Sequence, residues 1–278
     1  MTLRAAAFAI VVAAGLWSGG GGVAAAAPER VVSTHLCADV LLLLLADRSQ
    51  IASLSYFATD GNFTTEADAA QGLPLNHGLA EEILPLAPDL VFAGAFAARP
   101  LSFLLRRQNI PVVDLPLADS FEEIRRNIRL VAGLLGTEAR GARLIAAFDA
   151  ALPPAAAPDP TPPVVALYWS KGYTPASASL AGAAARHVGF VDLGQALGLD
   201  GAARVSLETL LLADPALLAK AGRDAAALAD LPLAHPALRG AFKGPRTVTI
   251  PDKLWVCGAP SVADAAWLMS DARKRLAP

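Results

Sequence analysis

Residues 79–94 read LAEEILPLAPDLVFAG, and residues 206–222 read SLETLLLADPALLAKAG. In each stretch a glutamate, Glu81 or Glu208, stands seven residues before a proline. Each pattern predicts a helix with an acid in its first turn, a stop at the proline and then an apolar strand. The helix dipole alone explains either acid. Because the pattern recurs at equal spacing, once in each half of the chain, it indicates two similar α/β lobes.

Short apolar strands alternate with helices in both halves. The pattern predicts strands at residues 31–33, 51–54, 90–93, 111–114, 164–168 and 246–250. It predicts helices at residues 38–46, 180–187 and 262–276. Ser120 and Glu123 have the spacing of a capping box that opens a further helix, which Gly136 ends. This alternation is typical of βαβ units and therefore of parallel sheets covered on both faces.

A proline-rich segment divides the chain. Thr137 caps the last helix of the first half, from Glu138 to about Leu152, and six of the eleven residues at 153–163 are proline. Such a segment is stiff and extended. The predicted organisation is an N-terminal α/β lobe at residues 28–137, a bridging helix with a linker at 138–163, and a C-terminal α/β lobe at 164–278.

The composition excludes several classes of protein. Of the 278 residues, 54% are hydrophobic and 17% are charged, which argues for a sizeable core and against disorder. A formal net charge of -2 offers no general attraction to nucleic acid or to an anionic membrane. Two cysteines are too few for a disulfide-rich scaffold.

Residues 1–27 have the pattern of a secretory signal peptide. Arg4 is followed by an apolar run at residues 5–17, and Ala25, Ala26 and Ala27 supply small residues for cleavage. The apolar run is shorter than the roughly 20 residues that a membrane-spanning helix needs. The mature protein is therefore expected to be exported and soluble.

Four stretches together resemble the periplasmic substrate-binding proteins of ABC importers for iron complexes and vitamin B12. They are residues 30–33 with the helix that follows, residues 79–91, residues 134–136 with the next helix, and residues 205–215. The resemblance covers essentially the whole mature chain. It implies two Rossmann-like α/β lobes with mainly parallel sheets, bridged by one long helix, with the ligand in the cleft between the lobes. The helix at 138–152 is the natural candidate for that bridge.

The resemblance also implies a partner and a location. It describes a periplasmic monomer without catalytic activity or intrinsic cofactor, which delivers a metal chelate to an ABC permease in the inner membrane. In the family, each lobe carries an exposed acid that docks on permease arginines, and by position these acids are Glu81 and Glu208 here. An exposed ion pair contributes only about 0.2–1 kcal/mol. We therefore expect the two acids to orient the encounter more than to supply affinity.

The candidate ligand-binding residues follow the predicted strands. Ligands of open α/β sheets bind beyond the C-terminal ends of the strands. The loops there carry imidazoles, thiols and aromatic rings, and the rings suit the faces of a flat metal chelate. These candidates are His35, Cys37, Tyr56, His77, Trp169, Tyr173, Trp255 and Cys257. Each aromatic ring also has an ordinary alternative as a core residue.

The two cysteines allow three interpretations. Cys37 and Cys257, one in each lobe, could form a disulfide, which an oxidising compartment would preserve. With His35 and His77 they could instead form a Cys2His2 metal set, although no paired ligand spacing supports it. They could also be independent. The sequence therefore leaves the metal ligands unknown.

Cations are scarce near the predicted cleft. Only Arg99 and Lys171 lie near its loops, which favours a neutral or macrocyclic chelate such as a corrinoid or haem over a strongly anionic siderophore. Two other classes remain: a receptor for free zinc or manganese ions, which needs three or four converging ligands, and a secreted enzyme with a Cys37–His77 nucleophile pair. The sequence contains no nucleophile elbow, zinc-protease motif or phosphate-binding loop that would support an enzyme.

Overall fold

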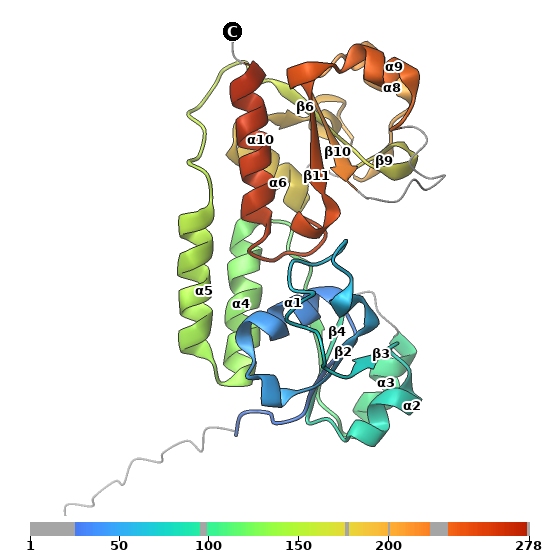
Figure 1. Ribbon diagram of the computed structural model, residues 1–278, viewed down its shortest axis with the longest axis vertical. Coiled ribbons are helices and arrows are strands. Elements are labelled where there is room, and N and C mark those ends of the chain that lie inside the picture. Colours follow the sequence, from blue (N-terminus) through green and yellow to red (C-terminus); the bar gives the residue numbers. More distant parts are fainter. Residues whose placement is uncertain (1–25, 95–98, 176–177, 200, 223–232, 277–278) are drawn as a thin grey trace, which may run out of the picture.

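The computed structural model describes residues 26–94, 99–175, 178–199, 201–222 and 233–276. Nearly all of the predicted signal peptide therefore lies outside the described residues. Within the described residues no helix is both long enough and apolar enough to cross a membrane. The chain forms two α/β lobes stacked along the long axis of the molecule (Figure 1).

The N-terminal lobe contains a parallel sheet of five strands in the order β3-β2-β1-β4-β5. The strands are β1 (Val31–Ser33), β2 (Ile51–Ser55), β3 (Leu75–Asn76), β4 (Leu90–Gly94) and β5 (Val112–Leu115). The helices of this lobe are α1 (Leu36–Leu45), α2 (Ala80–Ile83), α3 (Arg99–Arg107) and α4 (Phe121–Leu135), with short 3-10 turns η1 (Arg48–Gln50), η2 (Tyr56–Thr59) and η3 (Leu84–Leu86). The strands predicted in this half are confirmed to within one residue.

The C-terminal lobe contains a parallel sheet of four strands in the order β11-β10-β6-β8. These strands are β6 (Val164–Tyr168), β8 (Val191–Asp192), β10 (Leu217–Gly222) and β11 (Thr247–Pro251), and β7 (Tyr173–Thr174) pairs antiparallel with β9 (Ala203–Arg204). The helices are α6 (Leu180–His187), α7 (Leu193–Ala196), α8 (Leu207–Ala213), α9 (Pro236–Ala241) and α10 (Val262–Leu276), with 3-10 turns η4 (Ser170–Gly172), η6 (Gly244–Arg246) and η7 (Asp252–Leu254).

Helix α5 and an extended segment connect the lobes. Helix α5 (Glu138–Ala151) lies beside α4, and residues 152–163 then run along α10 to the start of β6 (Figure 1). The indole Nε1 of Trp267 in α10 donates to the carbonyl oxygen of Ala151 at 2.8 Å, so the C-terminal lobe is hydrogen-bonded to the C-terminal end of α5. The sheets end at Leu115 and resume at Val164, and the exact lobe boundaries at residues 137 and 163 remain predictions.

The helix ends show how far the local signals reach. Ser120 Oγ accepts from the backbone N–H of Glu123, and Gly136 ends α4 with a φ of 71°, both as predicted. The returning bond of the capping box differs, because the Glu123 carboxylate accepts from the N–H of Asp119 instead of that of Ser120. Thr137 occupies the N-cap of α5, but its hydroxyl donates back to Ala132 and makes no capping bond, so the predicted side-chain cap is wrong.

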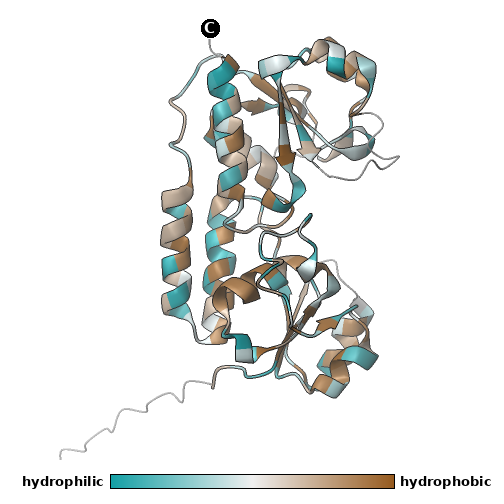
Figure 2. Cartoon of the chain, viewed as in Figure 1, coloured by the Kyte–Doolittle hydropathy of each residue, from teal (hydrophilic) through white to brown (hydrophobic). Residues whose placement is uncertain are grey.

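The apolar core continues from one lobe into the other. Helix α1 is brown over most of its length in Figure 2, and Leu41, Leu42 and Leu45 are almost completely buried, as expected for a helix inside a globular lobe. One cluster of buried side chains extends from these leucines through Phe148 of α5 to Met269 of α10. The two lobes therefore share one hydrophobic core.

The two glutamate–proline stretches form the same turn in both lobes. The aliphatic residues two positions after the glutamates, Ile83 and Leu210, are fully buried. The residues immediately before the prolines, Ala87 and Asp214, both have left-handed backbones, with φ of 45° and 41°. Strands β4 and β10 begin two residues after the prolines. The sequence repeat is therefore a structural repeat.

Candidate functional site

Two adjoining cavities lie where the C-terminal strand ends of the lobes meet. The smaller, of about 160 Å³, is lined by residues of both lobes and is called here the interlobe pocket: His35, Cys37, Leu115–Asp119, Asn127, Trp169, Ser179–Ala181, Trp255, Val256 and Gly258. The larger, of about 400 Å³, is called here the aromatic cavity and is lined by Trp169, Ser170, Tyr173, Ala221, Asp252, Trp255 and Val256. Three residues, Trp169, Trp255 and Val256, line both cavities, so the cavities share a wall.

The C-terminal lobe supplies most of the aromatic surface. Trp169 follows β6 directly, and its ring lies 5.8 Å from the ring of Trp255 at an interplanar angle of 60°. The backbone N–H of Trp169 donates to the backbone carbonyl oxygen of Tyr173 at 2.7 Å, which fixes the loop between the two residues. Tyr173 stays 41% exposed, and the guanidinium of Arg204 lies 5.3 Å from its ring centroid. Arg204 is a cation near the cleft that the sequence analysis missed.

The N-terminal lobe carries a separate aromatic group after β2 and β3. The rings of Tyr56 and Phe57 lie 4.0 Å apart, and Tyr56 stacks on His77 at 5.1 Å. Both rings and the imidazole are substantially exposed. In the part of the chain that the structure describes, Tyr56 and His77 line neither cavity, so the structure separates them from the other candidates.

A carboxylate fixes the orientation of His77. Glu82 accepts from the His77 backbone N–H at 2.6 Å, and its other oxygen lies 2.9 Å from His77 Nδ1. These two bonds from His77 lower the pKa of the Glu82 carboxyl. With Nδ1 engaged as the donor, the lone pair of the neutral imidazole is on Nε2.

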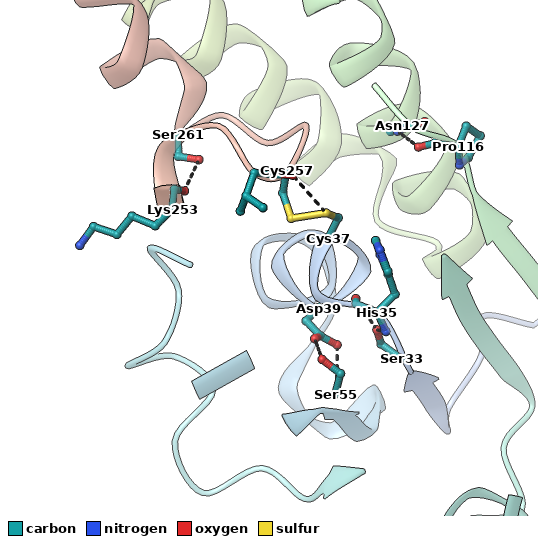
Figure 3. Close-up of a disulfide and its surroundings, with 11 residues drawn as sticks. Ser33, His35, Cys37, Asp39, Ser55, Pro116, Asn127, Lys253, Cys257 and Ser261 are labelled. Atoms are coloured by element: carbon teal, nitrogen blue, oxygen red, sulfur yellow. Dashed lines mark hydrogen bonds between the residues drawn. A yellow bond between two sulfur atoms is a disulfide. The ribbon is translucent and has the colours of Figure 1, made fainter. Parts of the chain in front are cut away.

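Cys37 of α1 and Cys257 of the loop before α10 form a disulfide between the lobes, with their Cα atoms 5.1 Å apart (Figure 3). Val40 and Ala259 pack around it in a small apolar cluster. Gly258 lies so close to Ala118 that an added Cβ would approach the Cβ of Ala118 to 2.4 Å. The two lobes are therefore joined by a covalent bond and close packing beside the interlobe pocket.

The disulfide corrects two of the alternatives drawn from the sequence. Disulfide sulfurs carry no thiolate, so Cys37 and Cys257 cannot complete a Cys2His2 metal set, and Cys37 cannot be the nucleophile of a Cys37–His77 pair. Among the described residues, no group of three or more His, Cys, Asp or Glu side chains converges as a metal site would require. A free-ion receptor therefore has no set of converging ligands in the described chain.

His35 is the N-cap residue of α1 and lines the interlobe pocket. Its ring packs on Gly94, where an added Cβ would lie 2.4 Å from His35 Cδ2, so only glycine fits at that position. Burial lowers the pKa of His35, and the imidazole is therefore neutral near pH 7. Its Nδ1 is buried and has no hydrogen-bond partner in the described protein.

The carboxyl of Asp39, four residues after His35 in the first turn of α1, is buried. Asp39 accepts from both the backbone N–H and the hydroxyl of Ser55, as Figure 3 shows, yet burial raises its pKa to about 6. The side-chain amide of Asn76 bonds to Ser33, Ser53 and Leu54 beside it. This polar network ties together the ends of β1, β2 and β3 under the cleft.

The acids of the repeated turn lie on the surface. Glu81 and Glu208 are exposed, each in the first turn of its helix, and in Figure 1 helices α2 and α8 lie on the same side of the molecule. The pKa of Glu208 is lowered by its own backbone N–H, by the Ser206 hydroxyl and by His235. Glu208 is therefore held in its charged form.

The described residues that line the two cavities include no lysine or arginine. Lys171 lies outside both linings, and the side chain of Arg99 is not among the parts that the structure describes. Two lining residues that the sequence analysis missed are Asp119 and Asn127. Asp119 follows β5, so the rule that ligands bind beyond strand ends would have found it.

Comparison with known proteins gives the same fold. The family model described as periplasmic binding protein matches residues 31–240. No curated protein sequence matches the chain. The apo form of the periplasmic heme-binding protein RhuT from Roseiflexus sp. RS-1 is 21% identical, with a TM-score of 0.68, and the match covers 88% of this chain and 98% of that chain.

Two further solved structures are similar at lower identity. The periplasmic vitamin B12 binding protein BtuF of Vibrio cholerae is 16% identical, with a TM-score of 0.63, over 90% of this chain and 98% of that chain. The molybdate periplasmic binding protein MolA of Haemophilus influenzae is 18% identical, with a TM-score of 0.66, over 89% of this chain and 87% of that chain. At these identities the likeness shows the fold alone. With the family match over most of its length, the chain belongs to the periplasmic binding protein family.

Proposed function

We propose that the protein captures a metal chelate in the cleft between its lobes and delivers it to the permease of an ABC importer. The observation that carries this proposal is the aromatic cavity. Its volume of about 400 Å³ lies within the range of small-molecule sites, and it is lined by Trp169, Tyr173 and Trp255 without a lysine or arginine among the described residues. Such a surface suits the face of a flat or macrocyclic chelate whose charge is largely neutralised.

The ligand-binding roles are assigned from this geometry. Trp169, Tyr173 and Trp255 contact the chelate directly, while His35 and the disulfide of Cys37 and Cys257 form the floor behind it. Tyr56 and His77 line neither cavity, so in this proposal they contact a part of the chelate that extends beyond the aromatic cavity toward the N-terminal lobe. Because Glu82 holds His77 Nδ1, the Nε2 atom is available as a ligand to the chelated metal, and a carboxylate behind an imidazole raises its basicity.

The exposed acids are the docking points for the permease. Glu81 and Glu208 occupy equivalent positions in the two lobes and both are exposed, so together they present two negative charges to one partner. Two charges on separate lobes fix an orientation that a single charge would leave free to rotate. In this proposal the signal peptide is removed on export, and the mature protein acts in the periplasm as a monomer.

Native mass spectrometry and transport assays test the proposal together. Protein isolated from the periplasm should carry a non-covalent adduct with the mass of a chelate, and a protein without any chelate in vivo or in titration would contradict the cargo assignment. The double variant Glu81→Gln/Glu208→Gln should lose most transport while its Kd for the cargo is unchanged. Glu138→Gln is the matched control, because Glu138 is also an exposed acid in the first turn of a helix. Loss of cargo binding in the double variant would refute the docking role.

A further inference from the structure

Two residues that line the interlobe pocket each carry a buried polar atom without a hydrogen-bond partner in the described protein. His35 Nδ1 belongs to the N-terminal lobe and Trp169 Nε1 to the C-terminal lobe, and both residues line this pocket. Neither atom has a hydrogen-bond partner within the described protein, although most buried side-chain polar atoms are paired. Two such atoms in one pocket indicate that the pocket is built to bind a polar group.

The chemistry of the two atoms defines that group. An indole Nε1 can only donate a hydrogen bond. The imidazole of His35 is neutral, because burial lowers its pKa, so one of its ring nitrogens accepts. The backbone N–H groups at the start of α6, beside Ser179 in the pocket wall, add donors. A group with one acceptor and one donor, such as a carboxamide, matches this arrangement.

Charge distinguishes an amide from a carboxylate. Asp119 is the charged side chain among the described residues that line the pocket, and no lysine or arginine accompanies it there. Partial burial and the nearby Glu123 raise the pKa of Asp119, as expected where two carboxylates lie close together. A carboxylate arm would enter a partly buried site beside a like charge without a counter-ion.

Size separates the two cavities by role. The aromatic cavity, at about 400 Å³, falls in the range of ordinary ligand sites, whereas the interlobe pocket, at about 160 Å³, falls well below it. The face of a ring can lie against the aromatic wall of the first, whereas only a side arm fits the second. Because Trp169 and Trp255 line both, an arm on a ring stacked in the aromatic cavity reaches the pocket directly.

We propose that the interlobe pocket binds an uncharged carboxamide arm of the cargo, its carbonyl oxygen accepting from Trp169 Nε1 and its NH₂ group donating to His35 Nδ1. This inference rests on the proposed function and makes it more specific. The cargo is a macrocycle with amide arms, as corrinoids have, and is not a macrocycle with carboxylate arms, such as haem.

A matched pair of probes tests the inference on the native, disulfide-bonded protein. Haemin and its bis-amide have the same ring and metal and differ only in the arms, and dicyanocobinamide presents amide arms on a corrin ring. Tryptophan fluorescence titration should give the bis-amide and dicyanocobinamide a Kd at least tenfold lower than that of haemin. This comparison requires no variant and does not depend on the folding of one.

The variant Trp169→Phe then identifies the donor. It should weaken binding of the bis-amide about tenfold and leave the Kd of haemin nearly unchanged, since only the amide uses Nε1. Trp267→Phe is the control with the same substitution, because the indole of Trp267 donates to Ala151 and neither residue lines either cavity. If Trp169→Phe raised the Kd of haemin and of its bis-amide by the same factor, the variant would have lost packing in general, and this result would contradict the inference.

The outcomes separate this inference from the proposed function. If haemin binds as tightly as its bis-amide, the amide pocket is wrong while a chelate-binding protein remains. If all three probes fail to bind while the periplasmic protein carries a siderophore, the inference falls and the proposed function stands. If the protein carries and binds no chelate, both fall.

Discussion

The turn before β4 in the N-terminal lobe and the turn before β10 in the C-terminal lobe both place a left-handed residue before a buried proline, but their helices and caps differ. In the C-terminal lobe, Ser206 caps the helix and accepts from Thr209, and Asp214 pairs with Arg246 at 2.5 Å. In the N-terminal lobe, Leu79 occupies the N-cap without a side-chain bond, and Ala87 has no side chain that could pair.

The shared features are therefore the ones that matter for the turn. Both turns retain the exposed glutamate, the buried aliphatic residue, the left-handed residue and the buried proline. The helix caps and the ion pair differ between the two turns. The turn therefore depends on the spacing from glutamate to proline and on the buried aliphatic residue, and it does not require a particular cap or ion pair. The following experiments measure how similar the two lobes are and how strongly they are coupled.

Removing the disulfide should have the largest effect. The double variant Cys37→Ser/Cys257→Ser opens a loop with a sequence separation of 220 residues, and the chain-entropy model predicts a loss of about 5 kcal/mol in the free energy of unfolding. Urea denaturation followed by tryptophan fluorescence measures it. Reduced wild-type protein should match the variant, and an unchanged midpoint would show that the core shared by the lobes couples them without the bond.

Truncating the buried aliphatic residue of each turn should give similar losses. Ile83→Ala and Leu210→Ala each remove a fully buried side chain, so each should lower the free energy of unfolding by about 2–5 kcal/mol. Leu212→Ala is the control, since Leu212 is 87% exposed and should change stability little. A large loss in one lobe and a negligible loss in the other would show that the repeat is not equivalent in packing.

Replacing Asp39 should flatten the pH dependence of stability. Its pKa is about 6 in the folded protein against an ordinary 3.8, so the folded state binds the proton more tightly. The contribution of Asp39 to the free energy of unfolding is highest below about pH 3.8, falls as the pH rises to about 6, and is constant above that pH. The total fall is about 3 kcal/mol. In Asp39→Asn this fall should disappear.

Denaturant unfolding at pH 4 and pH 7 measures the effect on Asp39→Asn. Asp68→Asn is the control for the loss of one negative charge, since Asp68 is exposed. If Asp39→Asn kept the same difference between the two pH values as the wild type, Asp39 would not be the group that titrates.

Glycine at the left-handed positions should give the smallest effect and should distinguish the turns. Ala87→Gly relieves a left-handed alanine and should stabilise the protein by about 1 kcal/mol. Asp214→Gly should give no net gain, because aspartate tolerates this backbone better and its pairing with Arg246 is lost. Differential scanning calorimetry should show a raised Tm only for Ala87→Gly. Equal Tm shifts in the two variants would mean that the side chain of Asp214 and its pairing with Arg246 do not stabilise the turn.

The sequence predicted those parts of the fold that local signals define. The strand at 164–168 and the helices at 180–187 and 262–276 match their predicted bounds. Strands of two residues, such as β3 and β8, are too short to carry a period and were not predicted. The Thr137 cap failed because the hydroxyl found a partner in the preceding helix.

The site was less predictable because its parts come from both lobes. The rule on strand ends led to His35, Trp169 and Trp255, which do line one pocket. It could not reach Asn127, which lies inside α4 and whose side-chain amide donates to the carbonyl oxygen of Pro116, another residue of the pocket wall. It also could not separate Tyr56 and His77 from the other candidates, since chain position does not show which sheet edge faces which cavity.

The disulfide also limits how the protein can release what it carries. Residues 152–163 connect the lobes along the outer side of the molecule (Figure 1), and the Cys37–Cys257 disulfide connects them again at the junction (Figure 3). The disulfide, the shared apolar core and the contact of Gly258 with Ala118 together restrict how far one lobe can turn against the other. If a permease binds Glu81 and Glu208 as proposed, it holds the two lobes on either side of this junction, and we expect the outer edge of the cleft to widen more than the part beside the disulfide.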